Sequence, residues 1–369
     1  MKTTKRIAGA AARLILAAGI WCAGQAPAAS TNYVAASPAG SDANGGTGWD
    51  DAWATIGYAA AQSAPGSLIL VSNGLYEITA RIALDKPVTV RGFSGNPADV
   101  VVDGKRSTTV VCFYLSHSGA TVESLTATNA MRGFHLYYGG TVSNCVSTGH
   151  RSDRKANGVY CQNGGLVTHC LIAGNLGYDH GGGAYLVAGG TLRNCLIVDN
   201  ETTRAPFFGG GGGVLASGGV IENCTITRNT ARRGGGVYAV QSGLVLRNSI
   251  VYGNRAPTLP EIFGSPAIAY CCTTPLPAGA GNTAADPVFA DTGAGDYRLL
   301  PGSAAMNSGA CQSWMASAVD LDGQPRTNGV VDMGCYEYTP GALDCGFSVS
   351  PATAFTGMPV SAAIRSRAG

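Results

Sequence analysis

One short phrase recurs six times between Thr121 and Asn254, and it constrains the fold more than any other feature of the chain. Each copy is an apolar run, a polar corner and a second apolar run. The residue in the middle of the copies advances by 20, 25, 25, 29 and 25 residues, through Leu125, Cys145, Cys170, Cys195, Cys224 and Ser249. Because a unit of this length cannot bury its own hydrophobic face, the period indicates a solenoid of stacked coils.

A second repeated phrase lies between the copies of the first. It reads GFHLY, GVYCQ, GAYLV, GVLAS and GVYAV, and its copies begin at Gly133, Gly158, Gly183, Gly213 and Gly236. One period therefore holds two or three short strands separated by glycine or asparagine corners, with no segment long enough for a helix. A propeller blade would need about 40–45 residues per unit. The pattern predicts an all-β fold, a single-stranded parallel β-helix with about one coil per 25 residues.

Two columns of asparagine mark corners of the predicted coils. The first holds Asn144, Asn194, Asn223 and Asn248, with His169 once in their place, and the second holds Asn175, Asn200, Asn229 and Asn254. Asparagine tolerates left-handed backbone torsion angles, and stacked amides can hydrogen-bond from coil to coil. We therefore expect tight corners and amide ladders at these positions.

The cysteines of the repeat lie beside apolar residues such as Ile172 and Ile197. Coils about 4.8 Å apart bring stacked thiols close together, but the side chains point the same way, which is poor geometry for a disulfide. We predict that Cys170, Cys195 and Cys224 are buried free thiols. Outside the column, pairing stays open for Cys271, Cys272, Cys311, Cys335 and Cys345.

Four segments are predicted along the chain. Residues 1–28 have the basic start, short apolar run and small-residue cleavage site of a signal peptide, so we expect a secreted or cell-surface protein; the alternative is a buried N-terminal helix. Residues 29–66 form an N-terminal cap, and residues 67–338 form the β-helix with a C-terminal closing motif. Residues 339–369 read as a linker and a truncated β-sandwich-like tail. No segment after residue 28 is apolar enough to span a bilayer.

The predicted cap contains a helix and a polar loop. Residues at helical spacing predict an amphipathic helix that covers the open strand edges of the first coil, and they are Trp49, Trp53, Ile56 and Ala60. In the preceding loop, Asp42 and Asn44 either form an ordinary turn or bind calcium. We expect no other cofactor and no dedicated metal site.

The composition narrows the class of partner. Charged residues make up only 12% of the chain and the net charge is +2, which argues against nucleic acid because that partner requires a basic surface. A rigid, exported repeat protein of this kind is expected to be a monomer whose partner is a polysaccharide or surface glycan.

Both ends of the region from about residue 32 to residue 338 resemble known exported proteins. The opening, with YVAASPAGSDANGG, WATI and LILVSNGLYEI, is similar to the start of bacterial pectate-lyase-like β-helix proteins. The ending, GNTAADPVFADTGAGDYRLLPGSAAMNSG followed by DLDGQPR and VDMGCYEY, resembles the choice-of-anchor Q family, exported right-handed β-helices largely without an assigned activity. The NTARRGGGVY segment is more weakly similar to polymorphic outer-membrane protein repeats. The resemblance covers roughly residues 32–338 and implies a right-handed, pectin-lyase-like helix.

Charged residues gather in this ending, and they are Asp320, Asp322, Arg326, Asp332 and Glu337. One interpretation is a set of catalytic carboxylates. The other is a set of ion pairs and turns, with Arg326 facing a carboxylate. We favour the structural role because the motif is expected to close the last coil rather than to line the repeat.

A second group of polar residues follows the second asparagine column. Because the corners of successive coils stack, we expect a lateral ribbon of mixed charge with aromatics, drawn from His150, Arg151, Asp153, Arg154, Lys155, Tyr178, Asp179, His180, Glu201, Arg204, Phe207, Phe208, Arg232, Arg233 and Arg255. The predicted binding residues are Asp153, Arg154, Tyr178, Asp179, His180, Arg204, Arg232 and Arg233. The simpler interpretation is that corners are where a solenoid keeps its solubilising charges.

Two functions fit this ribbon. The favoured one is binding of extracellular glycan, or adhesion, without catalysis. The alternative is a polysaccharide lyase or glycoside hydrolase acting on an acidic polysaccharide along the lateral face, with candidate catalytic residues Lys155, Asp179, His180, Glu201 and Arg204. A lyase would use an arginine or lysine base with a cation neutralising the acid. A hydrolase would need Asp179 and Glu201 as a pair about 5 Å apart.

Overall fold

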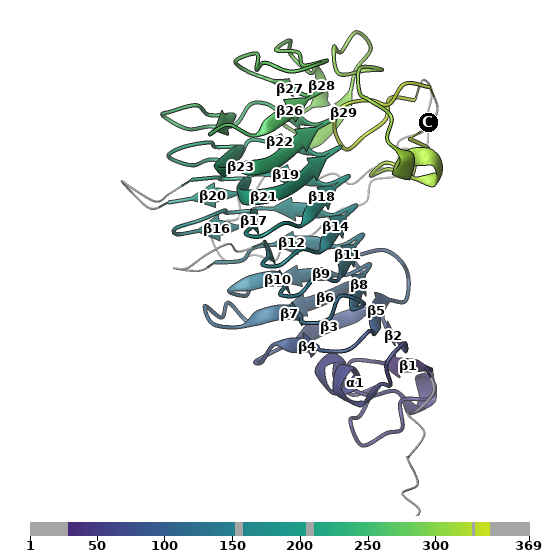
Figure 1. Ribbon diagram of the computed structural model, residues 1–369. Coiled ribbons are helices and arrows are strands. Elements are labelled where there is room, and N and C mark those ends of the chain that lie inside the picture. The colour runs from purple at the N-terminus through teal and green to yellow at the C-terminus, as the bar shows by residue number, and fades with distance from the viewer. Residues whose placement is uncertain (1–28, 152–157, 204–209, 327–328, 340–369) are drawn as a thin grey trace, which may run out of the picture.

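The computed structural model describes residues 29–151, 158–203, 210–326 and 329–339. The predicted signal peptide and nearly all of the predicted tail therefore lie outside the described residues. The described chain winds into an elongated solenoid of parallel coils (Figure 1), which confirms the predicted parallel β-helix. No helix among the described residues is long and apolar enough to cross a membrane.

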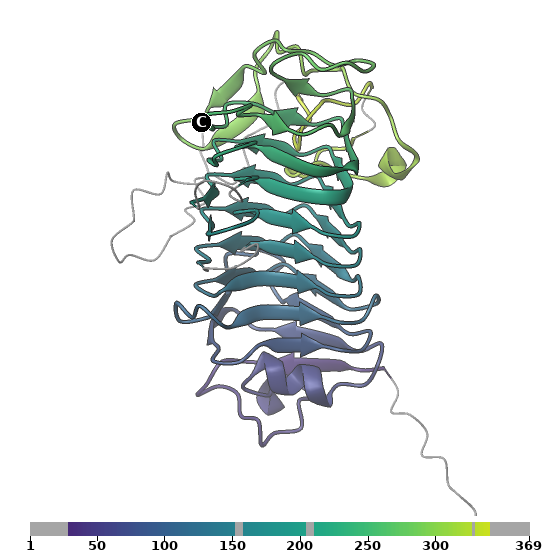
Figure 2. The same cartoon turned by 60° about the vertical axis from the view of Figure 1, so that its left-hand side comes forward.

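The coils have three faces of parallel strands stacked from coil to coil (Figure 2). The first and second faces belong to one sheet, joined through β21 and β23, and the third face is a separate sheet. The first face consists of β4 (Ile82–Leu84), β7 (Val111–Leu115), β10 (Arg132–Leu136), β13 (Val159–Cys161), β17 (Ala184–Leu186), the first halves of β21 (Val214–Glu222) and β23 (Val237–Arg247), and β25 (Ile262–Phe263). The second consists of β1 (Thr31–Val34), β2 (Leu68–Val71), β5 (Thr89–Gly92), β8 (Thr121–Glu123), β11 (Thr141–Ser143), β14 (Leu166–Thr168), β18 (Thr191–Arg193), the second halves of β21 and β23, and β26 (Ala267–Ala269). The third consists of β3 (Gly74–Glu77), β6 (Val100–Asp103), β9 (Thr126–Thr128), β12 (Val146–Thr148), β15 (Leu171–Ala173), β19 (Leu196–Val198), β22 (Thr225–Thr227), β24 (Ile250–Val251) and β27 (Cys272–Thr273).

Alternation along each short strand separates the core from the surface. In β10, Phe134 and Leu136 are fully buried while His135 between them faces outward. The rings of Phe113 and Phe134 stack inside adjacent coils with centroids 5.7 Å apart. The core is thus a continuous column of stacked apolar side chains, and its outer faces display whatever residue the alternation leaves outside.

Both asparagine columns behave as predicted, in different ways. Backbone φ lies between 48° and 53° at all five positions of the first column, so these residues make left-handed corners between the second and third faces. The second column points inward and forms a buried amide ladder in which the Nδ2 atoms of Asn175, Asn200 and Asn229 lie 2.9–3.0 Å from the Oδ1 one coil further on. His150, which was predicted to lie in the ribbon, instead occupies this buried column at its start.

The prediction of free, buried thiols is confirmed. Cys170, Cys195 and Cys224 are buried and unbridged. Their thiols lie 3.1–3.3 Å from carbonyl oxygens two residues earlier in the chain. The remaining cysteines of the described chain are also free, with Cys311 exposed.

The N-terminal cap differs in detail from the prediction. Instead of one helix from Trp49, a 3-10 turn η1 (Trp49–Asp51) is followed by α1 (Ile56–Gln62), which packs against β1, β2 and β4. Asp42 causes the separation: its Oδ1 accepts hydrogen bonds from the backbone amides of Ala54 and Thr55 at 2.9 Å. Thr55 in turn caps α1. Both Asp42 oxygens are engaged by protein donors, and calcium binding at this loop stays a prediction.

The C-terminal ending packs against the last coil through Ala305 and Met333, which cluster with Cys272, and also runs along the side of earlier coils. The last coil is followed by an antiparallel pair, β28 (Phe289–Asp291) and β29 (Asp296–Leu299), and a 3-10 turn, η2 (Ser313–Ser317). From there the chain turns back along the corner of the first asparagine column (Figure 1). We call residues 305–326 and 329–338 the C-terminal strap. Val319 O lies 2.9 Å from His169 Nε2 and 3.0 Å from Asn194 Nδ2.

Charged residues of the strap form the predicted structural ion pairs. The guanidinium of Arg326 is fully buried and donates to Glu337 Oε1 at 2.6 Å. Asp322 pairs with Arg298 through two hydrogen bonds, and Asp320 and Asp332 accept hydrogen bonds from backbone amides within the strap. The structural interpretation of these residues is therefore right, whereas their predicted place at the end of the helix is wrong, because they hold the strap against its side.

Candidate functional site

The ribbon residues that the structure describes do stack from coil to coil. Parallel bridges join Arg151 to Leu176 and Glu201 to Thr230, and Thr230 in turn to Arg255. Between them, β16 (Leu176–Gly177) pairs with β20 (Glu201–Thr202). Arg232 and Arg233 are exposed two and three residues beyond Thr230. Of the other predicted ribbon residues, Asp153, Arg154, Lys155, Arg204, Phe207 and Phe208 lie outside the described residues.

The register changes the prediction for the two candidate carboxylates. Glu201 stands opposite Leu176 of the preceding coil, and Asp179 follows Leu176 three residues later on that preceding coil. His180 bridges to Gly210 of the next coil. The strand register therefore places Leu176, and not Asp179, directly opposite Glu201, and the pairing of the two carboxylates stays a prediction.

A column of aromatic side chains on the first face escaped the sequence analysis. The outward-facing positions of successive strands are in register from coil to coil and hold Tyr114, His135, Tyr160, Tyr185, Leu215, Tyr238 and Phe263. Neighbouring rings contact one another, with centroids 4.9 Å apart for Tyr114 and His135 and 4.6 Å apart for His135 and Tyr160. Part of the signal was present in the sequence, because five of these seven residues are the third letters of the GFHLY, GVYCQ, GAYLV, GVLAS and GVYAV phrases.

The ribbon and the aromatic column meet. His180 stacks on Tyr185 with centroids 5.9 Å apart and the rings 13° from parallel. Arg233 lies over Phe263, 5.3 Å from its ring centroid. Two residues predicted to bind a ligand therefore border the column. The middle of the column is covered, because Tyr185 and Leu215 are buried, so the accessible rings lie on either side of Tyr185 and Leu215.

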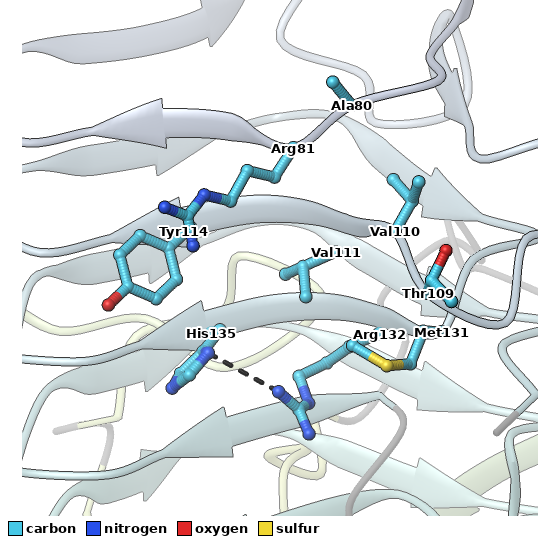
Figure 3. Close-up of a pocket in the computed structure, with 9 residues that line it drawn as sticks. All are labelled: Ala80, Arg81, Thr109, Val110, Val111, Tyr114, Met131, Arg132 and His135. Carbon is cyan, nitrogen blue, oxygen red and sulfur yellow. Dashed lines mark hydrogen bonds between the residues drawn. The ribbon is translucent and has the colours of Figure 1, made fainter. Parts of the chain in front are cut away.

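A pocket of about 420 Å³ lies at the N-terminal end of the aromatic column (Figure 3). It is lined by Ala80, Arg81, Thr109, Val110, Val111, Tyr114, Met131, Arg132 and His135. The Arg81 guanidinium lies 4.3 Å from the Tyr114 ring centroid, and that of Arg132 lies 4.5 Å from the Tyr160 ring centroid. Tyr137 and the exposed Tyr138 extend the aromatic surface beside the pocket.

Burial sets the charge states in the pocket. It lowers the pKa of Arg132 to about 10, so this side chain remains a cation at neutral pH. Burial, followed by the Arg132 charge, lowers the pKa of His135 to about 4, so the imidazole is neutral. Among the described residues, no group of three or more histidine, cysteine or carboxylate side chains is placed to hold a metal ion.

Comparison with known proteins identifies the class of fold. Residues 109–271 match the family model described as a right handed beta helix region. The family match and the parallel topology together define the central coils as a right-handed parallel β-helix, in the sense predicted.

Solved structures with similar folds share little sequence with this chain. Pectate lyase Pel9A has a TM-score of 0.44 and 14% identity over 85% of this chain and 98% of its own. A pectin methylesterase from Aspergillus niger has a TM-score of 0.38 and 15% identity over 69% and 90%. A rhamnogalacturonan lyase has a TM-score of 0.33 and 13% identity over 66% and 68%. No curated protein matches the sequence.

Proposed function

We propose that this protein binds an extended acidic glycan along the first face, without catalysis, as an exported protein of the choice-of-anchor Q type. The observation that carries the proposal is the convergence of the ribbon on the aromatic column, at His180 with Tyr185 and at Arg233 with Phe263. Flat rings offer apolar contact to the faces of sugars, and the nearby guanidinium groups attract carboxylates.

The geometry of the column suits a chain-like ligand. Strands of neighbouring coils are about 4.8 Å apart, so the rings recur at a regular interval along the axis, as the sugar units of an extended polysaccharide do. Tyr185 is buried and the other rings of the column are half-buried between neighbours, so little side-chain entropy is lost when a ligand stacks on the accessible rings. This arrangement favours a linear glycan over a compact small molecule.

The catalytic alternative has less support. Of its three candidate bases, Lys155 and Arg204 lie outside the described residues and Arg232 is exposed. In addition, Glu201 stands opposite Leu176 rather than Asp179. Binding requires only the surface that the described residues form, whereas a lyase or hydrolase requires an acid and a base aimed at one bond.

A panel of acidic and neutral polysaccharides tests the proposal. We expect retardation of the protein in gels that contain an acidic polysaccharide, with no release of unsaturated or reducing ends. Tyr160→Ala should reduce retardation, and Phe93→Ala, which removes an exposed ring outside the column, should not. New chain ends would establish the enzyme instead, and equal retardation of both variants would place binding elsewhere.

A further inference from the structure

The pocket at the end of the column has the size and lining of a binding site of its own. Its volume of about 420 Å³ lies within the range of about 300–1,000 Å³ that is usual for small-molecule sites. Val110, Val111 and Met131 supply apolar walls, and the Tyr114 ring supplies a flat side. Two guanidinium groups, from Arg81 and Arg132, are the only cations among its lining residues, and no lining residue is acidic.

The two arginines differ in environment. Arg81 is exposed, lies against Tyr114 and makes no salt bridge within the described chain. Arg132 is only 7% exposed, and the cost of burying its charge is what lowers its pKa. A carboxylate in the pocket would stabilise the charged form of both arginines, and its planar shape matches the fork of a guanidinium.

His135 sits where it would respond to such an anion. Its Nδ1 lies 3.4 Å from Arg132 Nη1, which can only donate, so Nδ1 accepts. The ring proton is then on Nε2, which donates to Gln162 Oε1 at 3.2 Å. The charged or titratable described residues that face the imidazole come from β10 and the elements packed around it, and they are Arg81, Tyr114, Arg132, Tyr137 and Tyr160.

We propose that this pocket is a subsite for one carboxylate-bearing sugar unit, held by Arg81 and Arg132, and that its occupancy draws a proton onto His135. The inference rests on the proposed glycan-binding function and adds the class of sugar and its dependence on pH. A carboxylate near the imidazole favours the protonated ring, and by linkage protonation of the ring tightens the hold on the carboxylate.

Titration calorimetry with single sugars tests the subsite. Methyl galacturonoside should bind and methyl galactoside should not. Arg81→Gln should weaken binding at least about tenfold, which corresponds to about 1.4 kcal/mol, since a charge-assisted hydrogen bond is lost. The control is Arg91→Gln, which changes an exposed arginine of the second face that pairs with Glu123. Equal affinity for the two sugars, an unchanged affinity after Arg81→Gln, or sulfate binding as tightly as the uronide would overturn the subsite.

The proton linkage has a separate readout. Calorimetry near pH 5, in two buffers of different ionisation enthalpy, should show net proton uptake when the uronide binds, and affinity should rise from about pH 7 toward pH 4. His135→Gln should remove both effects, and a binding enthalpy that does not depend on the buffer would overturn the linkage. If the single sugar binds but no polysaccharide does, the proposed function fails and the subsite stands; the reverse result removes the subsite alone.

Discussion

The side-chain amide of Asn200 lies 2.9 Å from Oδ1 of Asn229, one coil further along the axis. The same Oδ1 also accepts the backbone N–H of Asn200 at 3.0 Å. The side-chain oxygen of an asparagine in the buried ladder therefore accepts hydrogen bonds from the coil before it. The ladder ends at Asn254, which donates to the carboxylate of Glu261 at 2.7 Å. A carboxylate only accepts hydrogen bonds, so no further acceptor is needed beyond it.

Removal of one member of this ladder should be costly. Asn229→Ala leaves the buried backbone N–H of Asn200 without its acceptor, whereas Asn200 Nδ2 keeps two carbonyl acceptors. The change also removes the donor to Ile197 O and Thr227 O. A buried group left without a partner costs about 1–3 kcal/mol. We expect the free energy of unfolding to fall by at least about 2 kcal/mol in urea titrations. Asn73→Ala, at an exposed position, should change it by less than about 0.5 kcal/mol. Equal effects of the two changes would show that the ladder is not stabilising.

The glycine that begins each second phrase packs against the asparagine ladder. A Cβ at Gly213 would lie 2.7 Å from Gly236 O and 3.0 Å from Asn229 Nδ2. Gly213→Ala should therefore lower stability by about 1–3 kcal/mol through overpacking. Gly218→Ala is the matched control on the same strand, since its nearest neighbour would be 3.6 Å away. Melting temperatures of the two variants compare them directly, and an unchanged value for Gly213→Ala would contradict the packing argument.

The buried thiols of the cysteine column should not react with alkylating reagents in the folded protein. Burial raises the pKa of Cys161 to about 12 and raises that of Cys195 well above its usual value, so reactive thiolate is scarce. Of the cysteines in the described chain, we expect iodoacetamide to label Cys311 alone under native conditions and all of them after unfolding. Mass spectrometry of the unreduced protein should find no linked peptides among Cys170, Cys195 and Cys224.

Stability should fall as the pH rises through the range in which Glu337 titrates. Burial raises the pKa of Glu337 from 4.5 to about 7, against the opposing effect of Arg326. Between these values the folded state holds the proton more tightly than the unfolded state, so its contribution is complete below about pH 4.5 and is lost by about pH 7. The slope of melting temperature against pH should flatten in Glu337→Gln. A wild-type protein that is more stable at pH 8 than at pH 5 would show that the ion pair outweighs burial.

Exposed arginines of the ribbon should contribute to binding and little to stability. Arg232→Ala combined with Arg233→Ala should weaken binding of an acidic glycan without moving the melting temperature, because exposed charges stabilise little. The difference should shrink at high salt, where screening already suppresses the attraction. If the double substitution leaves the affinity unchanged, the binding site does not include this edge of the column.

The sequence patterns predicted the features that repeat from coil to coil. They did not predict the features that depend on contacts between residues far apart in the sequence. The period and the two asparagine columns follow from local corner geometry, so the coils, the left-handed residues and the amide ladder could be read in advance. The strap could not, because Val319 and His169 are 150 residues apart and no repeat relates them. The predicted helix does not begin at Trp49, because Asp42 from an earlier loop accepts hydrogen bonds from the backbone amides of Ala54 and Thr55.

The aromatic column shows a different limit. Each ring was visible in its phrase, but the predicted site followed charge, and half-buried tyrosines such as Tyr160 carry none. Only the register, which puts Tyr160 between His135 and Tyr185, turns separate rings into one column.

The strap also bears on how the molecule comes apart. In a simple solenoid each coil contacts only its neighbours, so unfolding can start at either end and spread coil by coil. Here the strap is hydrogen-bonded to corners of four successive coils, at His169, Asn194, Asn223 and Asn248. These coils are tied into one cooperative block. The described coils before His169 take no part in these hydrogen bonds to the strap, and they are linked to their neighbours and, through Asn144 Nδ2 and Gly95 O, across one intervening coil. Fraying under load or heat should therefore begin at the N-terminal end and halt where the strap begins.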